Sequence, residues 1–373
     1  MANRAKTLNA DVFTIADLRD KASKKLPKAY REFYNEGAMD MISVQDNEAA
    51  YNRYKIRPRI LRNVADLDTS TDLFGHRISF PFAFSPAATH KLAHPDGELA
   101  TSAAAAACNI PMALSAYASC ALEDVIRQRG EQGTNPYIMQ FSILKDRALT
   151  QQILQRAESA GYQAVMMTVD APLLGRRLNE FRNAFALPAG VGYPNLRLAA
   201  MADLVDQGAG LAYEDAWEWD QAIPWIRSVT RLPIWLKGVY TAEDVALAIR
   251  HGVDGILISN HGGRQLDGVP ATLDALRECA PIAKGKIKIA VDGGIRRGTD
   301  IFKALALGAD YCFAGRIPIW GLAYNGSKGV ELAVQLLHEE FKLAMALAGC
   351  RTVKDINKSH LSILQNDGVL SKL

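Results

Sequence analysis

Short apolar runs alternate with segments of helical periodicity from residue 80 onward. This alternation is typical of βα units that feed a parallel sheet. We expect eight strands, at residues 80–85, 111–115, 136–141, 163–169, 233–237, 254–259, 287–292 and 310–315. Segments between them, such as residues 242–251 and 299–307, are amphipathic and end near a glycine, as helices commonly do. The pattern therefore predicts an α/β fold, a (β/α)8 TIM barrel.

The chain before residue 80 begins with a helical pattern. Thr14 precedes a periodic segment at residues 15–24 and is placed to cap it, and residues 28–35 form a second helical segment. We expect residues 1–79 to be an N-terminal helical extension that covers one end of the barrel.

One long segment after the fourth strand has little periodicity. Residues 178–217 carry Pro188 and Gly190 among other turn residues. Loops of this length without secondary structure are often active-site lids. We therefore expect a lid here, in a single domain of residues 1–373 whose barrel spans about 80–350.

The composition limits the class of protein. Apolar residues make up 49% of the chain and charged residues 22%, as in an ordinary globular protein. The net charge is +3 with mixed signs, so we expect no nucleic-acid partner. Since no apolar run approaches the roughly 18 residues of a membrane span and no signal peptide is evident, we expect a soluble protein that is not secreted and has no membrane contact. The five cysteines lack CxxC spacing, which predicts reduced thiols and no metal site.

Polar residues end several predicted strands. In a TIM barrel these strand ends form the catalytic face. The alternative, that polar residues simply cap strands where loops begin, stays open at this point. The residues are Ser85, Ser115, Lys237, Ser259 and Asp292.

The loop after the sixth strand combines a base with a cation. Residues 259–267 read Ser-Asn-His-Gly-Gly-Arg-Gln-Leu-Asp. The glycines let the backbone approach a ligand closely, His261 supplies an imidazole, and Arg264 can bind a carboxylate with two parallel hydrogen bonds. A lone histidine is more often structural, but Arg264 and the strand-end position favour a functional interpretation.

This loop resembles the signature of the FMN-dependent 2-hydroxy acid oxidases and dehydrogenases, and glycolate oxidase in particular. The resemblance extends from about residue 26 to residue 351. Other stretches that match the family are residues 57–61, 94–98, 168–170, 174–177, 292–300 and 314–316.

The resemblance implies FMN as cofactor and assigns residues to it. A phosphate needs unobstructed backbone N–H groups and cations, which glycine and arginine pairs near the seventh and eighth strands would supply. Lys237 would stabilise negative charge on the reduced flavin. The expected FMN-binding residues are Pro86, Ala87, Ala88, Ser115, Gln140, Thr168, Lys237, Ser259, Asp292, Gly293, Gly294, Arg296, Gly315 and Arg316.

The resemblance also implies the catalytic residues. His261 would take a proton from the substrate as two electrons pass to FMN, by hydride or by carbanion transfer, and both routes stay open. Asp170 would orient the imidazole and stabilise its protonated form. Arg177 and Arg264 would hold the substrate carboxylate.

Two positions depart from the family, and both belong to the substrate site. Phe33 and Ser142 stand where the family has tyrosines that contact the substrate, while Tyr117 replaces a tryptophan of glycolate oxidase. Either two hydroxyl contacts are lost, or the pocket accepts a larger substrate. We favour the larger substrate, because the base, its aspartate and both arginines remain.

We therefore expect oxidation of an L-2-hydroxy acid bulkier than glycolate to the 2-oxo acid, with O2 reduced to H2O2. The alternatives are a dehydrogenase with another electron acceptor, or a flavin-binding barrel with altered or lost activity. The resemblance implies a homo-oligomer, a tetramer or octamer. The sequence ends in Ser371, Lys372 and Leu373, a tripeptide that the peroxisomal import receptor reads, so we expect a peroxisomal protein and otherwise a cytoplasmic one.

Overall fold

Eight parallel strands close into a barrel in the computed structural model, which describes residues 7–130, 133–196, 213–365 and 368–373. Every strand pairs with its neighbour in chain order, and the last pairs with the first. All eight predicted strands are confirmed, and β8 runs two residues further than predicted. The strands are β4 (Phe82–Phe84), β5 (Met112–Leu114), β6 (Tyr137–Phe141), β7 (Ala164–Thr168), β8 (Ile234–Val239), β9 (Gly255–Ile258), β10 (Lys288–Val291) and β11 (Tyr311–Ala314).

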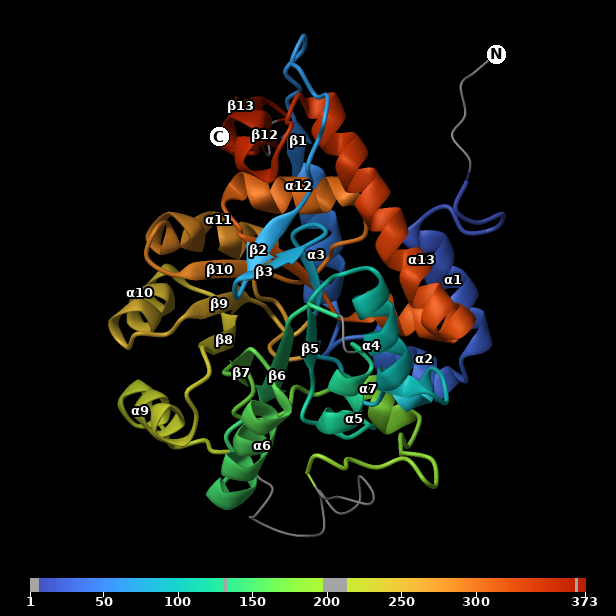
Figure 1. Cartoon of the computed structure of the whole chain (residues 1–373), viewed down its shortest axis with the longest axis vertical. Coiled ribbons are helices and arrows are strands. Elements are labelled where there is room, and N and C mark those ends of the chain that lie inside the picture. Colours follow the sequence, from blue (N-terminus) through green and yellow to red (C-terminus); the bar gives the residue numbers. More distant parts are fainter. Residues whose placement is uncertain (1–6, 131–132, 197–212, 366–367) are drawn as a thin grey trace.

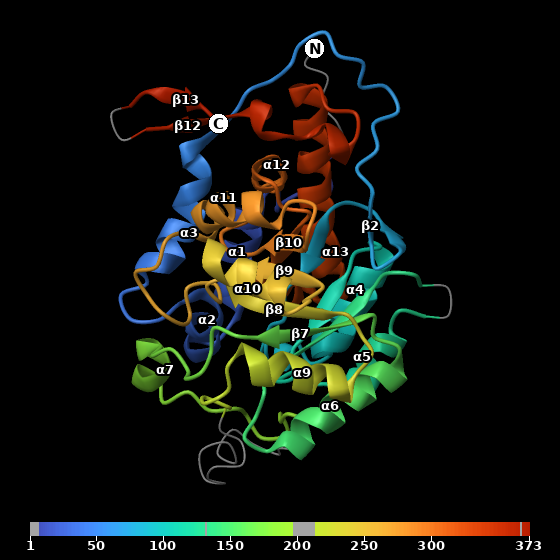
Figure 2. The ribbon, with the colours of Figure 1, turned by 90° about the vertical axis from the view of Figure 1, so that its left-hand side faces the viewer.

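Helices surround the barrel, as Figures 1 and 2 show. The two helices predicted from periodicity are α10 and α12. Helix α10 begins at the predicted residue and ends one residue earlier than predicted, and α12 begins one residue earlier and ends at the predicted residue. Gly308 ends α12 with a φ of 114°, a conformation that glycine adopts without strain. The helices are α4 (Gly97–Ala107), α5 (Leu122–Arg127), α6 (Arg147–Ala160), α9 (Trp219–Val229), α10 (Ala242–Arg250), α11 (Thr272–Ala283), α12 (Gly298–Leu307) and α13 (Arg316–Ala348). Short 3-10 turns are His90–Leu92, Val353–Asp355 and Lys358–His360.

The N-terminal extension begins with the predicted helices, α1 (Ile15–Lys25) and α2 (Lys28–Asn35). Thr14 caps α1, because its hydroxyl accepts the amide hydrogen of Asp17 at 3.1 Å. Helix α1 lies along α13 (Figure 1). A third helix, α3 (Ile42–Arg53), which the sequence pattern did not indicate, packs against α11.

Short strands outside the barrel were not predicted. β1 (Tyr54–Ile56) pairs with β12 (Leu361–Leu364), which in turn pairs with β13 (Leu370–Lys372), so the strand after α3 and the C-terminal end of the chain form one small antiparallel sheet. Figure 2 shows the β12–β13 hairpin projecting beside α13. A hairpin of β2 (Thr71–Leu73) and β3 (His76–Ile78) precedes the barrel.

The predicted lid is partly helical, so the expectation that residues 178–217 lack secondary structure is wrong at α7 (Leu178–Arg182). The segment packs on α2: the ring of Phe185 stacks on Phe33 at 4.5 Å, and Asn183 donates a hydrogen bond to Glu32. Residues 197–212 of the predicted lid lie outside the described residues.

Three further observations hold for the part of the chain that the structure describes. No helix there is long and apolar enough to cross a membrane. No cluster of His, Cys, Asp and Glu there has the arrangement of a metal site. All five cysteines are unpaired, and four of them are buried.

Candidate active site

A cavity of about 520 Å³ opens at the carboxyl ends of the barrel strands. This volume is within the usual range for cofactor and substrate pockets. Most of the residues singled out in the sequence line it, although Asp170 and Ser259 do not. Those that do are Phe33, Pro86, Ala87, Ala88, Ser115, Tyr117, Gln140, Ser142, Thr168, Arg177, Lys237, His261, Arg264, Asp292, Gly293, Gly294, Arg296, Gly315 and Arg316.

Asp170 and Ser259, the two residues that do not line the cavity, both contact His261. Its Nδ1 is 3.1 Å from Oδ1 of Asp170, and its backbone N–H donates to the hydroxyl of Ser259 at 3.1 Å. A carboxylate can only accept, so the Nδ1 proton faces Asp170 and Nε2 is left as a proton acceptor. The backbone at His261 is left-handed, with a φ of 58°, which is uncommon for a residue with a side chain and frequent at functional sites.

The charges around His261 keep it neutral at rest. Burial and the positive charge of Lys237, whose Nζ is 3.3 Å from Nδ1, lower the pKa of His261, while Asp170 acts in the opposite direction. Burial would raise the pKa of the Asp170 carboxyl, but Lys237 and His261 hold it below its usual value. The pair is therefore an ionised aspartate next to a neutral imidazole, the state a general base requires.

Asp170 has little freedom to move. Gln265 donates through Nε2 to the backbone carbonyls of Asp170 and Leu173, both at 2.9 Å. A Cβ atom at Gly238 would lie 2.6 Å from the Asp170 side chain, so only glycine fits there. These contacts fix the carboxylate relative to the imidazole.

Two guanidinium groups lie close together on one side of the cavity. Nη2 of Arg264 is 3.1 Å and Nη1 of Arg177 is 3.4 Å from the same carboxylate oxygen of Glu180, on α7. Arg264 also stands over the ring of Phe33, 4.9 Å from its centre, and donates to the backbone carbonyl of Glu36 at 3.2 Å. The pair is suited to bind a carboxylate.

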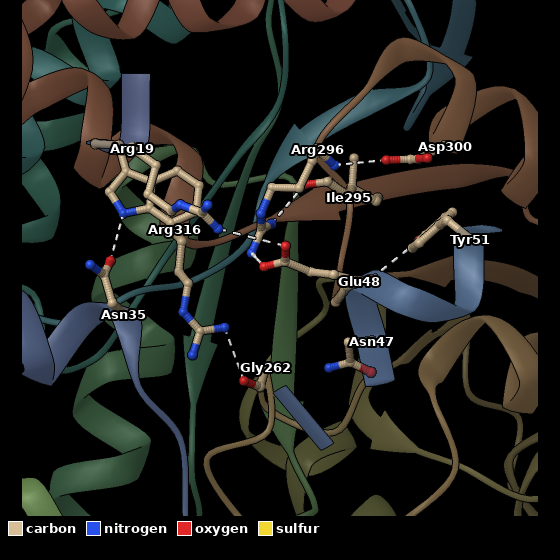
Figure 3. A network of polar contacts seen from close by, with 12 residues as sticks. Arg19, Asn35, Asn47, Glu48, Tyr51, Gly262, Ile295, Arg296, Asp300 and Arg316 are labelled. Atoms are coloured by element: carbon tan, nitrogen blue, oxygen red, sulfur yellow. Dashed lines mark hydrogen bonds and ion pairs between the residues drawn. The ribbon is translucent and has the colours of Figure 1, made fainter. Parts of the chain in front are cut away.

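Arg296 and Arg316 are a second pair of arginines that line the cavity (Figure 3). Arg316 lies next to Arg264, because both guanidinium groups donate to the backbone carbonyl of Glu36. Arg296 forms an ion pair with Glu48 of α3 at 2.8 Å, and Arg316 donates to the backbone carbonyl of Gly262 at 2.9 Å. Burial and the charge of Arg296 lower the pKa of Arg316 to about 10. An anion here would relieve this repulsion, so the pair indicates a phosphate site.

Buried polar atoms without a partner also indicate a ligand next to Arg296. Among the described residues, Nε of Arg296 and Oδ1 of Asp292 are buried and make no hydrogen bond. Buried polar groups are normally satisfied, so we expect a bound group to supply the partners. The backbones of Gly293 and Gly294 are left-handed, with φ of 96° and 81°, and a Cβ at Gly294 would lie 1.9 Å from the Asn47 carbonyl oxygen.

Polar side chains line the middle of the cavity. Gln140 donates to the hydroxyl of Thr168 at 2.9 Å, and Ser85 donates to Asp292 at 2.8 Å. Lys237 is only 3% exposed and has its ammonium group in this region. A flat heterocycle with polar edges and a phosphate at one end fits this arrangement, so the residues present fit FMN.

The sequence analysis did not identify several residues of the site. Leu173 and Leu174 are 74% and 58% exposed at the cavity, and their place directly before the matched arginines could have drawn attention to them. No sequence signal marked the others, Tyr193 and Tyr213 in the cavity and Glu48 and Glu180 as arginine partners.

Comparison with known proteins agrees with this site. The sequence is 53% identical to "Oxidase FUB9" of Fusarium oxysporum f. sp. lycopersici, over 97% of this chain and 94% of that protein. It is 41% identical to "Peroxisomal (S)-2-hydroxyacid oxidase GLO3" of Arabidopsis thaliana, over 94% and 96%. The solved structure of mandelate oxidase with benzoyl-formic acid superposes with a TM-score of 0.84 at 36% identity, over 92% of this chain and 97% of that one. The pattern of the FMN-dependent dehydrogenase family matches residues 22–363, and the chain belongs to that family.

Proposed function

We propose that the protein oxidises an L-2-hydroxy acid to the 2-oxo acid, with O2 as electron acceptor and H2O2 as product. The observation that carries the proposal is the contact of His261 with Asp170 in the same cavity as the paired guanidinium groups of Arg177 and Arg264. This combination supplies a base and a carboxylate site, which are the two groups that oxidation of a 2-hydroxy acid requires from the protein.

Each protein group has one task in this reaction. Arg177 and Arg264 bind the substrate carboxylate, and Nε2 of His261 takes a proton from the substrate. Asp170 then stabilises the imidazolium, while Lys237 faces the place where negative charge develops. FMN, when bound, accepts the two electrons and passes them to O2.

The FMN-binding residues are part of the proposal. Arg296, Arg316 and the glycines beside them would hold the phosphate. Gln140, Thr168 and Ser115 would bind the polar edges of the flavin ring, whereas Ser259, which lies behind the cavity wall, would act on the site through its contact with His261. The backbone of residues 86–88, which lines the cavity, would lie against the ring.

The cavity wall supports a substrate larger than glycolate. Phe33, Leu173, Leu174 and Ile319 present apolar surface there, and the small side chain of Ser142 leaves space after β6. Burying an apolar substrate group against this wall would be favourable by roughly 25 cal/mol per Å² of area removed from water. The similarity to mandelate oxidase favours a substrate with an aromatic side chain.

An anaerobic panel of 2-hydroxy acids tests the proposed function. Mandelate and other bulky acids should bleach the flavin absorbance of the FMN-loaded protein, and readmission of air should return the flavin colour with one H2O2 per substrate. Bleaching by no 2-hydroxy acid would refute the activity. Flavin that stays reduced in air but is reoxidised by a quinone would refute O2 as acceptor.

The double change Phe33→Tyr with Ser142→Tyr should reverse the order of substrates. Two added hydroxyls should raise kcat/KM for glycolate about 30-fold, since each hydrogen bond contributes about 1 kcal/mol. The smaller pocket should lower kcat/KM for mandelate. Steady-state H2O2 production measures both. A parallel change for both substrates would show that these positions do not set the size of the pocket.

We also propose that the protein resides in peroxisomes, as the name of one relative states for that relative. Ser371 and Lys372 lie in β13, paired with Ile363 and Ser362, so a receptor that reads an extended tail would first have to release this strand. An N-terminal fluorescent fusion should colocalise with a peroxisomal marker and spread through the cytoplasm when residues 371–373 are removed. Cytoplasmic signal from the intact fusion would contradict the proposal.

We further propose a homo-oligomer. Ile60 and Leu61 are exposed next to each other on the loop after β1, and burying these two side chains in a subunit contact would be favourable. Light scattering coupled to size-exclusion chromatography should give a tetramer or octamer, and a monomer would contradict the proposal.

A further inference from the structure

Tyr213 lies across from the segment that carries Ser142. An isolated antiparallel bridge pairs Tyr213 with Leu144, and the backbone N–H of Glu214 donates to the carbonyl of Ile143 at 2.8 Å. Ser142 stands where the family has a tyrosine, and a serine leaves most of that volume free. Tyr213 is therefore fixed directly beside the space that the missing ring would occupy.

Side chains strengthen this pairing of segments. Lys145 forms an ion pair with Asp215 at 3.2 Å. Arg147 forms a second ion pair with Glu214 and places its guanidinium 3.8 Å from the centre of the Trp217 ring. Two ion pairs and a cation–π contact give the backbone at residue 213 a defined position relative to β6 and α6.

The side chain of Tyr213 enters the cavity among substrate-site residues. Its ring meets the ring of Tyr117 edge to face, with the ring centres 6.5 Å apart, and Tyr117 and Arg177 line the same cavity. Burial raises the pKa of Tyr213, so the hydroxyl keeps its proton and can donate to an anion. A buried phenol among a cationic group and a second phenol is suited to bind an oxygen anion.

We propose that Tyr213 is a substrate-binding residue whose hydroxyl, set between Tyr117 and Arg177, donates to the carboxylate or hydroxyl oxygen of the substrate in place of the hydroxyl that the family carries at position 142. This inference rests on the proposed function. In the family a single tyrosine supplies both the hydroxyl and the wall of the pocket. Here Ser142 forms the wall and Tyr213 supplies the hydroxyl, so the pocket gains width without losing the hydrogen bond.

Tyr213→Phe removes only the hydroxyl and tests the proposal. We expect it to weaken binding of benzoylformate, a 2-oxo acid, to the FMN-loaded protein about 10- to 100-fold, because a hydrogen bond to a charged ligand is lost. The absorbance change of the bound flavin reports this binding without turnover. FMN content and melting temperature should stay unchanged. The control Tyr324→Phe, on α13 against Lys25, should leave the binding as it is.

A second substitution separates substrate contact from general packing. Ser142→Tyr should recover most of the affinity lost in Tyr213→Phe, because the hydroxyl returns from the other segment. In the wild-type background the same change supplies no missing hydroxyl, and its steric cost is the same because Tyr213→Phe keeps the ring, so the affinity for benzoylformate should gain clearly less there. The effect of Ser142→Tyr on benzoylformate affinity should thus be more favourable in Tyr213→Phe than in the wild type, and the difference measures the coupling between the two hydroxyls.

Three results would overturn the proposal: benzoylformate binding to Tyr213→Phe within twofold of wild type, an equal effect of Ser142→Tyr in both backgrounds, or loss of FMN from Tyr213→Phe. Failure of the proposed function gives a different result. A wild-type protein that binds benzoylformate but is reduced by no 2-hydroxy acid refutes the oxidation, while the binding comparison still decides the role of Tyr213. A wild-type protein that binds no 2-oxo acid refutes the substrate contact itself.

Discussion

His261→Ala should bind FMN normally and reduce it with substrate about 10²- to 10⁴-fold more slowly, the range that general acid–base catalysis supplies. Among the described residues no second base can replace the imidazole, because Lys237 is a cation and Asp170 is directed at Nδ1 rather than at the open cavity. Stopped-flow measurement of flavin absorbance under anaerobic conditions gives the rate. Equilibrium titration with benzoylformate should show that the carboxylate site remains.

His251→Ala is a matched control for this substitution. His251 ends α10 and lies near Asp220, away from the cavity, so its removal should leave the rate unchanged. Near wild-type flavin reduction in His261→Ala would remove His261 from the mechanism and, with it, the central step of the proposed function.

The barrel could be predicted because its signal is local. Each strand is a short buried run, several of them followed by a polar residue, and such a run needs no information from elsewhere in the chain. The eight strands therefore fell within a few residues of their predicted places. Strand β1 had no such signal: Tyr54 finds its partner at Ile363, and three residues are too few to show a period.

In the candidate site, too, some residues could be identified from the local sequence and others could not. His261 and Arg264 stand in one loop and could be identified as a base beside a cation, and the resemblance to the family supplied Asp170 and Arg177. Their roles remain predictions, although the structure brings all four side chains together.

The residues that sequence reasoning missed come from distant segments. Glu48 contacts Arg296, which is 248 positions later in the chain. Tyr213, near the end of the predicted lid, packs against Tyr117. Such contacts depend on how the extension and the loops pack on the barrel, which periodicity does not encode. The proposal that Tyr213 supplies the hydroxyl missing at Ser142 therefore could not have come from the sequence.

Asp170→Asn should lower the rate of flavin reduction about 10²- to 10³-fold, because a neutral amide cannot stabilise the imidazolium that forms when His261 takes the proton. The pH profile should shift as well, and the direction follows from the charges. In the wild type, burial and Lys237 place the pKa of His261 below its ordinary value of 6.5, while Asp170 raises it. kcat/KM should therefore be constant above neutral pH and fall only in acid, as His261 becomes protonated.

Without the Asp170 carboxylate the pKa of His261 should fall further, so the acid limb of the Asp170→Asn profile should move to lower pH while the plateau drops. Loss of the fold would instead lower activity without moving the limb toward acid. The surface change Asp124→Asn, which affects only an exposed pair with Arg127, should alter neither quantity. An acid limb that stays in place or moves to higher pH would show that Asp170 does not act on the imidazole electrostatically. Bound benzoylformate should persist in Asp170→Asn, because Arg177 and Arg264 are unchanged.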